Sequence, residues 1–345
     1  LLDPMGPLSL RPAHMPSFIP WILSYLGHSR KRQVTHIADA LHAINERVSA
    51  DYDPMLHAIG YADKVHDKGC IRVYDSYKSF KKNALEWRIR KQHGQDYELL
   101  GENDLRRMAP AIGKVKQFGV FQPQWRIMDD PKGLVGCLRH WLLAQGVTMV
   151  NANVDALVCA QSSVVGVTTS LGVINADMTI VAAGAWSKAL AKQVGEPCLL
   201  ESERGYNTTL PNPNISLKHE LLFAEEMFVV SPLAIGLRVG GASEFAGLKA
   251  APNYQRSDNL LRLAKRYLPD LNTEGGIQWV GHRPSTPDSL PVLGPSVKWQ
   301  GLCYAFGHSH LGMTQAASSG QMLAEVLMQP ELNTDLSAYS IGRFS

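Results

Sequence analysis

The residues of this chain that can do chemistry gather near its C-terminal end. Gly281-His282-Arg283-Pro284 resembles a turn at a strand end, and the stretch from Gly307 to Thr314 opens a helix of small residues. An arginine on a strand end can fork onto a carboxylate, and a glycine-lined helix N-terminus favours negative charge. Together they predict a site that holds a carboxylate-bearing substrate beside an anionic group.

A second glycine-terminated segment lies upstream. The apolar run Met178–Ala183 ends at Gly184 and is followed by Trp186. At the end of a strand, a glycine leaves room for a ligand or another backbone to approach closely. Glycines also end strands for packing reasons, so a purely structural role stays open for this turn.

Two kinds of site are absent from the pattern. None of the 29 glycines has another glycine two positions away, so the Gly-x-Gly-x-x-Gly fingerprint of dinucleotide binding is missing. His308 and His310 form a His-x-His pair without a nearby third ligand, which predicts no metal site.

Composition bounds the class of protein. A chain of 345 residues with 45% apolar and 19% charged residues is expected to form two globular domains. The net charge of +3 carries no nucleic-acid signature, so we expect no nucleic-acid partner. Five widely spaced cysteines favour a reducing compartment.

The sequence has no apolar run near the roughly 18 residues that a membrane span needs, and no signal-peptide pattern at its start. We therefore expect a cytoplasmic protein. The apolar segment Pro16–Gly27 precedes the basic cluster His28-Ser29-Arg30-Lys31-Arg32. It either packs on its own domain or lies on the inner face of a membrane.

Periodicity gives the expected elements of the first half. Residues 1–20 hold five prolines and predict an irregular start, whereas helical spacing predicts one long helix over 31–57. A strand is expected at Cys70–Tyr74 and a helix at Ser76–Lys91.

The second half reads as a helix from Pro131 to Gly146 followed by a strand at Val147–Val150. An antiparallel meander over 154–160 and 164–169 should return to a buried parallel strand within 176–183. The stretches 227–230 and 235–240 predict β-sheet, and 259–267 predicts a covering helix.

In this order, these motifs resemble the FAD-dependent D-amino-acid oxidase superfamily. The features that carry the resemblance are the Ile180–Ser187 turn, the segments around Arg204 and Arg238, the Gly-His-Arg-Pro turn, the Gly-His-x-His-Leu-Gly run and Leu1-Leu2-Asp3-Pro4. Within the superfamily the chain is most similar to D-hydroxyproline dehydrogenase-like members of the D-amino-acid dehydrogenase branch.

The resemblance implies an α/β (α+β) fold with two interleaved domains. A Rossmann-like FAD-binding domain is expected over 1–45, 130–198 and 279–345, N-terminally incomplete because the first βαβ unit with its Gly-rich segment is lacking. An antiparallel-sheet substrate domain is expected over 46–129 and 199–278.

The resemblance also implies roles for residues. The implied substrate-binding residues are Arg283, which binds the substrate carboxylate, Tyr206, which caps the pocket, and His310, which also lies beside the flavin; a buried structural role stays open for Tyr206. Arg204 and Arg238 organise the sheet or touch the substrate, and pairing of Arg283 with Asp288 or Glu244 is the structural alternative. The implied FAD-binding residues are Ala183, Gly184, Trp186, Gly307, His308, Ser309, His310, Leu311, Gly312, Met313 and Thr314.

The expected reaction is oxidation of the CH–NH bond of a small D-amino or imino acid, such as D-proline or D-hydroxyproline, with hydride transfer to FAD. Electrons then pass to a quinone or the respiratory chain. Two alternatives stay open: an oxidase of the amine or glycine type that uses oxygen, and a truncated chain or subunit that cannot bind FAD alone.

Overall fold

The computed structural model describes residue 3, residues 5–113 and residues 117–344. Leu1, Leu2 and Pro4 of the N-terminal motif lie outside the described residues. The chain divides into two units: unit 1 comprises 1–12, 60–137 and 204–281, and unit 2 comprises 13–59, 138–203 and 282–345. Each unit is built from segments far apart in the sequence, and the assignment of FAD to one of them stays a prediction.

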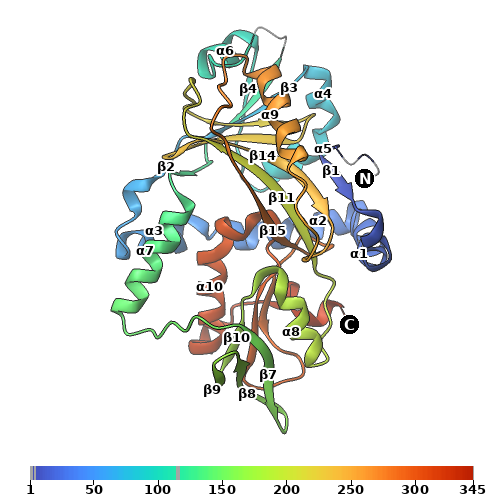
Figure 1. Cartoon of the computed structure of the whole chain (residues 1–345), viewed down its shortest axis with the longest axis vertical. Helices are drawn as coiled ribbons and strands as arrows, with labels where there is room; N and C mark the ends of the chain where they lie inside the picture. The colour runs from blue at the N-terminus through green and yellow to red at the C-terminus, as the bar shows by residue number, and fades with distance from the viewer. Residues whose placement is uncertain (1–2, 4, 114–116, 345) are drawn as a thin grey trace. The chain divides into compact units, whose positions relative to one another are not determined.

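Unit 1 is built on a nine-stranded sheet in the order β15-β11-β14-β13-β12-β3-β5-β4, with β1 pairing to β14 (Figure 1). The strands are β1 (Leu8–Leu10), β3 (Cys70–Tyr74), β4 (Glu98–Leu100), β5 (Phe118–Gln122), β11 (Glu201–Leu210), β12 (Glu220–Phe223), β13 (Phe228–Leu233), β14 (Gly236–Phe245) and β15 (Ile277–Ser285). β2 (Val65–His66) and β6 (Ile127–Met128) form a separate pair. Two strands, β11 and β15, continue from one unit into the other.

Helices complete unit 1: α4 (Tyr77–Lys82), α5 (Ala84–Gln92), α6 (Glu102–Met108) and α9 (Gln255–Tyr267), while α7 (Pro131–Ala144) spans the boundary between the units. The core of unit 1 lies between the sheet and α9. Leu260, Ala264 and Tyr267 pack there with sheet residues such as Tyr206 and Val239. The strands predicted at 70–74, 227–230 and 235–240 and the helix at 259–267 are confirmed.

Unit 2 contains the three-stranded sheet β10-β17-β16 and the antiparallel meander β7-β8-β9. Its strands are β7 (Val154–Ala160), β8 (Ser163–Thr169), β9 (Gly172–Asn175), β10 (Thr179–Val181), β16 (Val292–Pro295) and β17 (Leu302–Phe306). Its helices are α1 (Met15–His28), α2 (Lys31–Asn45), α3 (Val48–Ala58), α8 (Ser187–Gln193) and α10 (Gly312–Met328). The predicted meander and the return to a parallel strand are confirmed.

Three sequence predictions about the ends and strands of the chain need correction. The start is not irregular, because Leu8–Leu10 forms β1 and α1 already begins at Met15. Pro16 lies in the first turn of α1, where its missing N–H costs nothing. The apolar run 147–150 forms no strand, since no neighbouring strand pairs with it in the described residues. The parallel strand β10 is only partly buried, with Ile180 47% exposed.

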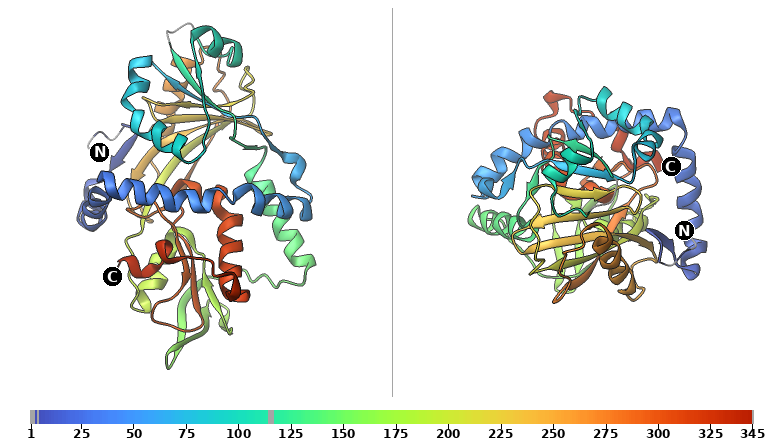
Figure 2. Two further views of the ribbon diagram at one scale, coloured as in Figure 1. Left: turned by 180° about the vertical axis from the view of Figure 1, so that it is seen from behind. Right: turned by 90° about the horizontal axis from the view of Figure 1, so that it is seen from above.

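The two long predicted helices are both broken. The break between α4 and α5 falls at Asn83. The helix predicted over 31–57 separates into α2 and α3 around Arg47, whose guanidinium pairs with Asp51 and, at 2.5 Å, with Glu325 on α10. α2 and α3 both contact α10, and the left view of Figure 2 shows the orange-red α10 running across these blue helices.

Candidate functional site

Two glycine-terminated strands of unit 2 end at the same edge of its central sheet. β10 and β17 pair in parallel, with Val181 opposite Tyr304. Because parallel neighbours place their carboxyl ends together, the turn that begins at Ala183 and the turn that begins at Gly307 leave the same edge. The predicted cofactor residues Ala183, Gly184 and Trp186 are thus joined with the run from Gly307 to Thr314.

The backbone of these turns requires left-handed residues. Gly184 has φ +53°, and a Cβ built on it would meet no atom within 4 Å, so the space beside it is open. Gly307 has φ +86°, and a Cβ there would lie 3.2 Å from Thr286 Cγ2. Ser309 is left-handed at φ +48° without being glycine, which costs on the order of 1 kcal/mol. The turn thus keeps a left-handed backbone at Ser309 that a residue with a side chain disfavours.

The N-terminus of α10 provides the positive end of a 17-residue helix at this edge. Leu311 is the N-cap and makes no side-chain capping bond, so the first N–H groups of α10 have no cap from that residue. Met313 is 41% exposed at the start of the helix. An uncapped helix start beside open left-handed turns fits an anionic cofactor such as FAD.

His308 turns inward from this run. Its Nε2 lies 2.8 Å from the hydroxyl oxygen of Ser319 on α10, and burial lowers the pKa of His308 to about 4. The ring is therefore neutral near pH 7 and ties the turn to the helix behind it. The part of the chain that the structure describes holds no group of three His, Cys, Asp or Glu side chains arranged for a metal ion.

The carboxyl end of β15 reaches the same turn through a bridge between Ser285 and His308. Side chains alternate along a strand, so Arg283 and Ser285 share one face and His282 takes the other. On its face His282 accepts or donates a 2.7 Å hydrogen bond with Ser202 Oγ and packs edge-on against Trp186 at 5.4 Å. Trp186 therefore contacts His282, the residue directly before Arg283 on β15.

On the opposite face, Arg283 and Ser285 meet the carboxylate of Glu203. The Ser285 hydroxyl donates to Glu203 Oε2 at 2.8 Å, Arg283 Nη1 lies 3.4 Å from Oε1, and His310 Nε2 lies 3.0 Å from Oε1. The side chain of Glu203 is 10% exposed, that of Arg283 24% and that of His310 58%. Glu203 thus joins the two predicted substrate residues of unit 2.

Burial lowers the pKa of Arg283, although Glu203 opposes this effect. The shift leaves the guanidinium charged, because an arginine begins from a pKa above 12. A guanidinium that is partly removed from water can orient a substrate carboxylate through charge-assisted hydrogen bonds. Sequence reasoning named Arg283 and His310 but missed Glu203, which lies 80 residues from Arg283 in the chain.

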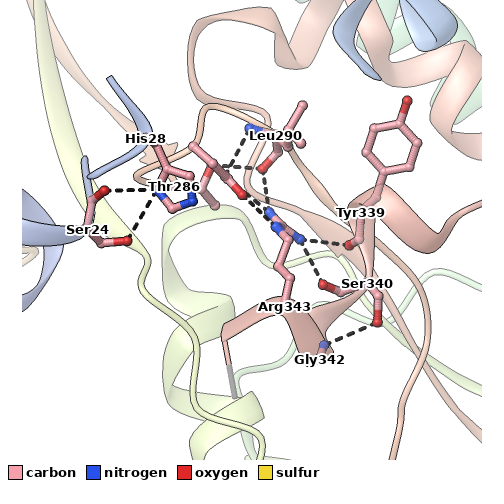
Figure 3. A network of polar contacts seen from close by, with 9 residues as sticks. Ser24, His28, Thr286, Leu290, Tyr339, Ser340, Gly342 and Arg343 are labelled. Atoms are coloured by element: carbon pink, nitrogen blue, oxygen red, sulfur yellow. Dashed lines mark hydrogen bonds and ion pairs between the residues drawn. The ribbon is translucent and has the colours of Figure 1, made fainter. Parts of the chain in front are cut away.

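The loop after Arg283 is fastened by Arg343 (Figure 3). Arg343 donates to Asp288 Oδ2 at 2.7 Å and to the carbonyl oxygens of Leu290 and Tyr339, both at 2.8 Å. Thr286 also donates to the Leu290 carbonyl at 2.7 Å. Asp288 therefore pairs with Arg343. The carboxylate that pairs with Arg283 is that of Glu203, rather than Asp288 or Glu244.

Tyr206, predicted as a pocket cap, lies in unit 1 and is fully buried. Its hydroxyl donates to Glu244 Oε2 at 2.6 Å and accepts the backbone N–H of Asn253 at 3.0 Å. Arg11 Nε lies 2.8 Å and Arg204 Nη1 3.4 Å from the same carboxylate. The hydroxyl is occupied internally, which departs from a pocket-facing position, so direct substrate contact by Tyr206 stays a prediction.

Arg238 is engaged in the sheet of unit 1. It donates to Thr209 Oγ1 at 3.2 Å, and its guanidinium lies 5.2 Å from the ring centre of Trp279. Burial lowers its pKa. Arg204 and Arg238 both hold sheet contacts in the structure, in keeping with the organising role weighed for them.

A sequence model of the family described as FAD dependent oxidoreductase (DAO) matches residues 17–326. A D-amino-acid oxidase of Bradyrhizobium diazoefficiens is 33% identical over 350 aligned residues, covering 100% of this chain and 83% of that protein. A D-amino acid dehydrogenase of the same organism is 28% identical over 357 residues, with the same coverage.

Two solved structures share the fold at low sequence identity. Glycine oxidase from Bacillus cereus superposes with a TM-score of 0.73 at 18% identity, covering 88% of this chain and 82% of that one. L-proline dehydrogenase from P. horikoshii gives 0.76 at 16% identity, covering 87% and 82%. These likenesses confirm the predicted α/β (α+β) fold class. No helix in the described residues is long and apolar enough to cross a membrane.

Proposed function

Because this chain belongs to the DAO family of FAD-dependent oxidoreductases, we propose that it oxidises the CH–NH bond of a small D-amino or cyclic imino acid. The family makes the chain an FAD-dependent amino-acid oxidoreductase, as the resemblance predicted. The observation that carries the finer proposal is the Arg283–Glu203–His310 cluster beside the glycine-terminated strand ends of unit 2.

Arg283 binds the substrate carboxylate in this proposal. Its guanidinium is partly exposed and comes from the end of β15, so its position is set by a strand rather than by a loop. Glu203 Oε1 pairs with Nη1 of the guanidinium at 3.4 Å, and a guanidinium can bind a planar substrate carboxylate through two parallel N–H donors. A fixed carboxylate orients the Cα–H bond of the substrate.

FAD is held by the turns 183–186 and 307–314 in this proposal, with the uncapped start of α10 facing its negative charge. When bound, FAD supplies the acceptor for the substrate hydride. The residues of the chain have the simpler tasks of orientation and electrostatics. His310 is the exposed member of the cluster, and we place it between the substrate and the cofactor.

The substrate class rests on the curated relatives. Both are named for D-amino acids, and the sequence motifs are most similar to D-hydroxyproline dehydrogenase-like proteins. We therefore propose D-proline, D-hydroxyproline or a small linear D-amino acid. Tyr206 is kept as a second-choice substrate contact, because its hydroxyl already has two internal partners.

The electron acceptor divides two versions of the proposal. A quinone or dye acceptor makes the protein a dehydrogenase, and oxygen makes it an oxidase. The second version is favoured by the name of the relative that is 33% identical. Steady-state assays separate them: turnover of D-proline with a quinone analogue, but without hydrogen peroxide in air, supports the dehydrogenase.

The activity itself is tested by comparing D-proline, L-proline, D-alanine and glycine at equal concentration with FAD-loaded protein. The proposal expects turnover of a D-amino acid at least tenfold faster than turnover of its L-enantiomer. Equal rates for both enantiomers, or turnover of glycine alone, would contradict it.

A further inference from the structure

One helix of unit 2 carries an apolar face that the fold does not use. In α1, Phe18 and Trp21 are buried, stack on one another at 5.1 Å and anchor the helix through a 2.9 Å bond from Trp21 Nε1 to the Ser285 carbonyl. The other side of the helix is different. Its exposed apolar side chains are Met15 (40%), Ile19 (48%), Leu23 (63%) and Leu26 (59%).

These four side chains form one stripe, the α1 stripe. At 3.6 residues per turn, positions 15, 19, 23 and 26 fall within an arc of about 80°. Tyr25 lies outside this arc, on the side of α1 that carries Phe18 and Trp21, where it stacks on Trp21 at 5.3 Å and is 42% exposed. The α1 stripe therefore exposes apolar side-chain surface to water.

The charged side chains that directly follow α1 are all positive. Arg30, Lys31 and Arg32 follow α1 directly and are exposed, and within the described part of the chain none of them has an ion-pair partner. Between Asp3 and Asp39 the sequence contains no Asp or Glu, although the whole chain has 31 acidic residues. The segment that contains α1 therefore carries no acidic residue of its own, and the carboxylate of Glu201 on β11 is paired with His14 before the helix.

The geometry points to an anionic bilayer surface as the partner: we propose that α1 lies in the interface of the membrane, with the α1 stripe in the acyl boundary and Arg30–Arg32 at lipid headgroups. An apolar stripe beside unpaired cations is what an interfacial helix needs. A 14-residue helix is about 21 Å long and about 10 Å wide, a footprint of about 200 Å², well below the ~800 Å² per partner of a stable protein interface.

This placement extends the sequence expectation for Pro16–Gly27. Phe18 and Trp21 bear out the packing of one face of the segment on its own unit, while contact of the exposed face with a membrane is the proposal made here. The inference depends on α1 and its basic flank alone, so it stands or fails separately from the proposed oxidation of a D-amino acid.

The test is flotation of the FAD-loaded full chain with phosphatidylcholine vesicles, with and without phosphatidylglycerol. We expect binding only to the vesicles that contain phosphatidylglycerol, weakened by salt. L23S/L26S should lower the partition coefficient about tenfold for each leucine. Removing Arg30, Lys31 and Arg32 together, each to Ser, should lower it about fivefold for each charge.

Matched controls keep the outcome specific. L171S/V173S removes two equally exposed apolar side chains from the β8–β9 hairpin, and replacing Lys78, Lys82 and Lys91 by Ser removes three exposed charges from α4 and α5. Both control variants should bind like wild type, and thermal unfolding should show that all variants are folded.

The proposal is overturned if wild type does not float with the phosphatidylglycerol vesicles, or if the α1 variants have the same partition coefficient as the control variants. A dimer in size-exclusion chromatography that L23S/L26S dissolves, together with no vesicle binding, would also overturn it and assign the α1 stripe to a second copy of the chain.

Discussion

Arg283 Nη1 lies 3.4 Å from Glu203 Oε1, a contact between the ends of two neighbouring strands whose residues are 80 positions apart. The same oxygen lies 3.0 Å from His310 Nε2. One buried carboxylate thereby sets the position of a partly exposed guanidinium and an exposed imidazole. On this contact we propose that Glu203 is a positioning residue for Arg283.

Replacing Arg283 by Met should raise the Michaelis constant for the D-amino acid by about 100-fold or more, because the carboxylate loses a charged, two-point partner. FAD content should be unchanged. Arg283→Lys should recover only part of the loss, since an ammonium lacks the planar fork. Steady-state kinetics check this, with exposed Arg262→Met on α9 as the control. An unchanged Michaelis constant in Arg283→Met would remove its assigned role.

Glu203→Ala should raise the Michaelis constant about tenfold. The variant keeps the positive charge of Arg283 but removes the carboxylate that positions it, so the substrate is held less accurately. Glu203→Gln should recover part of this, since the amide oxygen still accepts from Ser285. The control is Glu201→Gln on the same strand, whose partners are His14 and Lys188. If Glu201→Gln raised the Michaelis constant as much as Glu203→Ala, the positioning role would be wrong.

His308 should make stability depend on pH. Burial lowers its pKa from 6.5 to about 4, so between these values the unfolded chain binds a proton that the folded chain does not. Stability is therefore full above pH 6.5 and falls as the pH drops towards 4, by on the order of 3 kcal/mol.

His308→Gln should lack this component while keeping a partner for Ser319. Urea unfolding at several pH values measures the difference, with exposed His36→Gln as the control. Parallel pH profiles for wild type and His308→Gln would show that His308 does not titrate as its burial requires.

In the turn after β17, introducing a glycine at Ser309 and removing the glycine at Gly307 should change the free energy of unfolding in opposite directions. Ser309→Gly should stabilise the fold by about 0.5–1 kcal/mol, because φ +48° opposes a side chain. Gly307→Ala should cost about 1–3 kcal/mol, from φ +86° and the 3.2 Å approach to Thr286. Gly320→Ala within α10 has free space and serves as the control. Denaturant midpoints decide, and a destabilised Ser309→Gly would contradict the account.

Tyr206→Phe separates an internal role from substrate contact. The buried Glu244 would lose a 2.6 Å donor, so unfolding free energy should fall by about 1–3 kcal/mol with little change in the Michaelis constant. Burial acts to raise the pKa of Glu244, but Tyr206 and Arg11 hold it below its usual value. Unfolding and kinetic assays check both quantities. A raised Michaelis constant with unchanged stability would instead support direct contact of Tyr206 with substrate.

Local patterns predicted the elements near the site well, and pairwise contacts poorly. Gly184 and Gly307 predicted where the two strands end, because a left-handed backbone strongly favours glycine. Glu203 gave no signal, since only the adjacency of β11 and β15 brings it to Arg283. Asp288 was the nearer carboxylate in sequence, but Arg343 holds it.

Errors in the elements have similar physical causes. Periodicity ran through residues 31–57 because both halves bury one face, while the break is set by contacts of Arg47 with a distant helix. The run Val147–Val150 has the composition of a strand, but a strand needs a neighbour, and its side chains are exposed. Composition alone carries no information about that neighbour.

The most direct test of the central claim is anaerobic reduction of the bound flavin by D-proline, followed by visible absorption in wild type and Arg283→Met at equal FAD content. The account predicts bleaching of wild type by D-proline or another small D-amino acid, and bleaching of Arg283→Met only at about 100-fold higher substrate. Flavin that stays oxidised in wild type with every D-amino acid, or equal bleaching of both proteins, would contradict it.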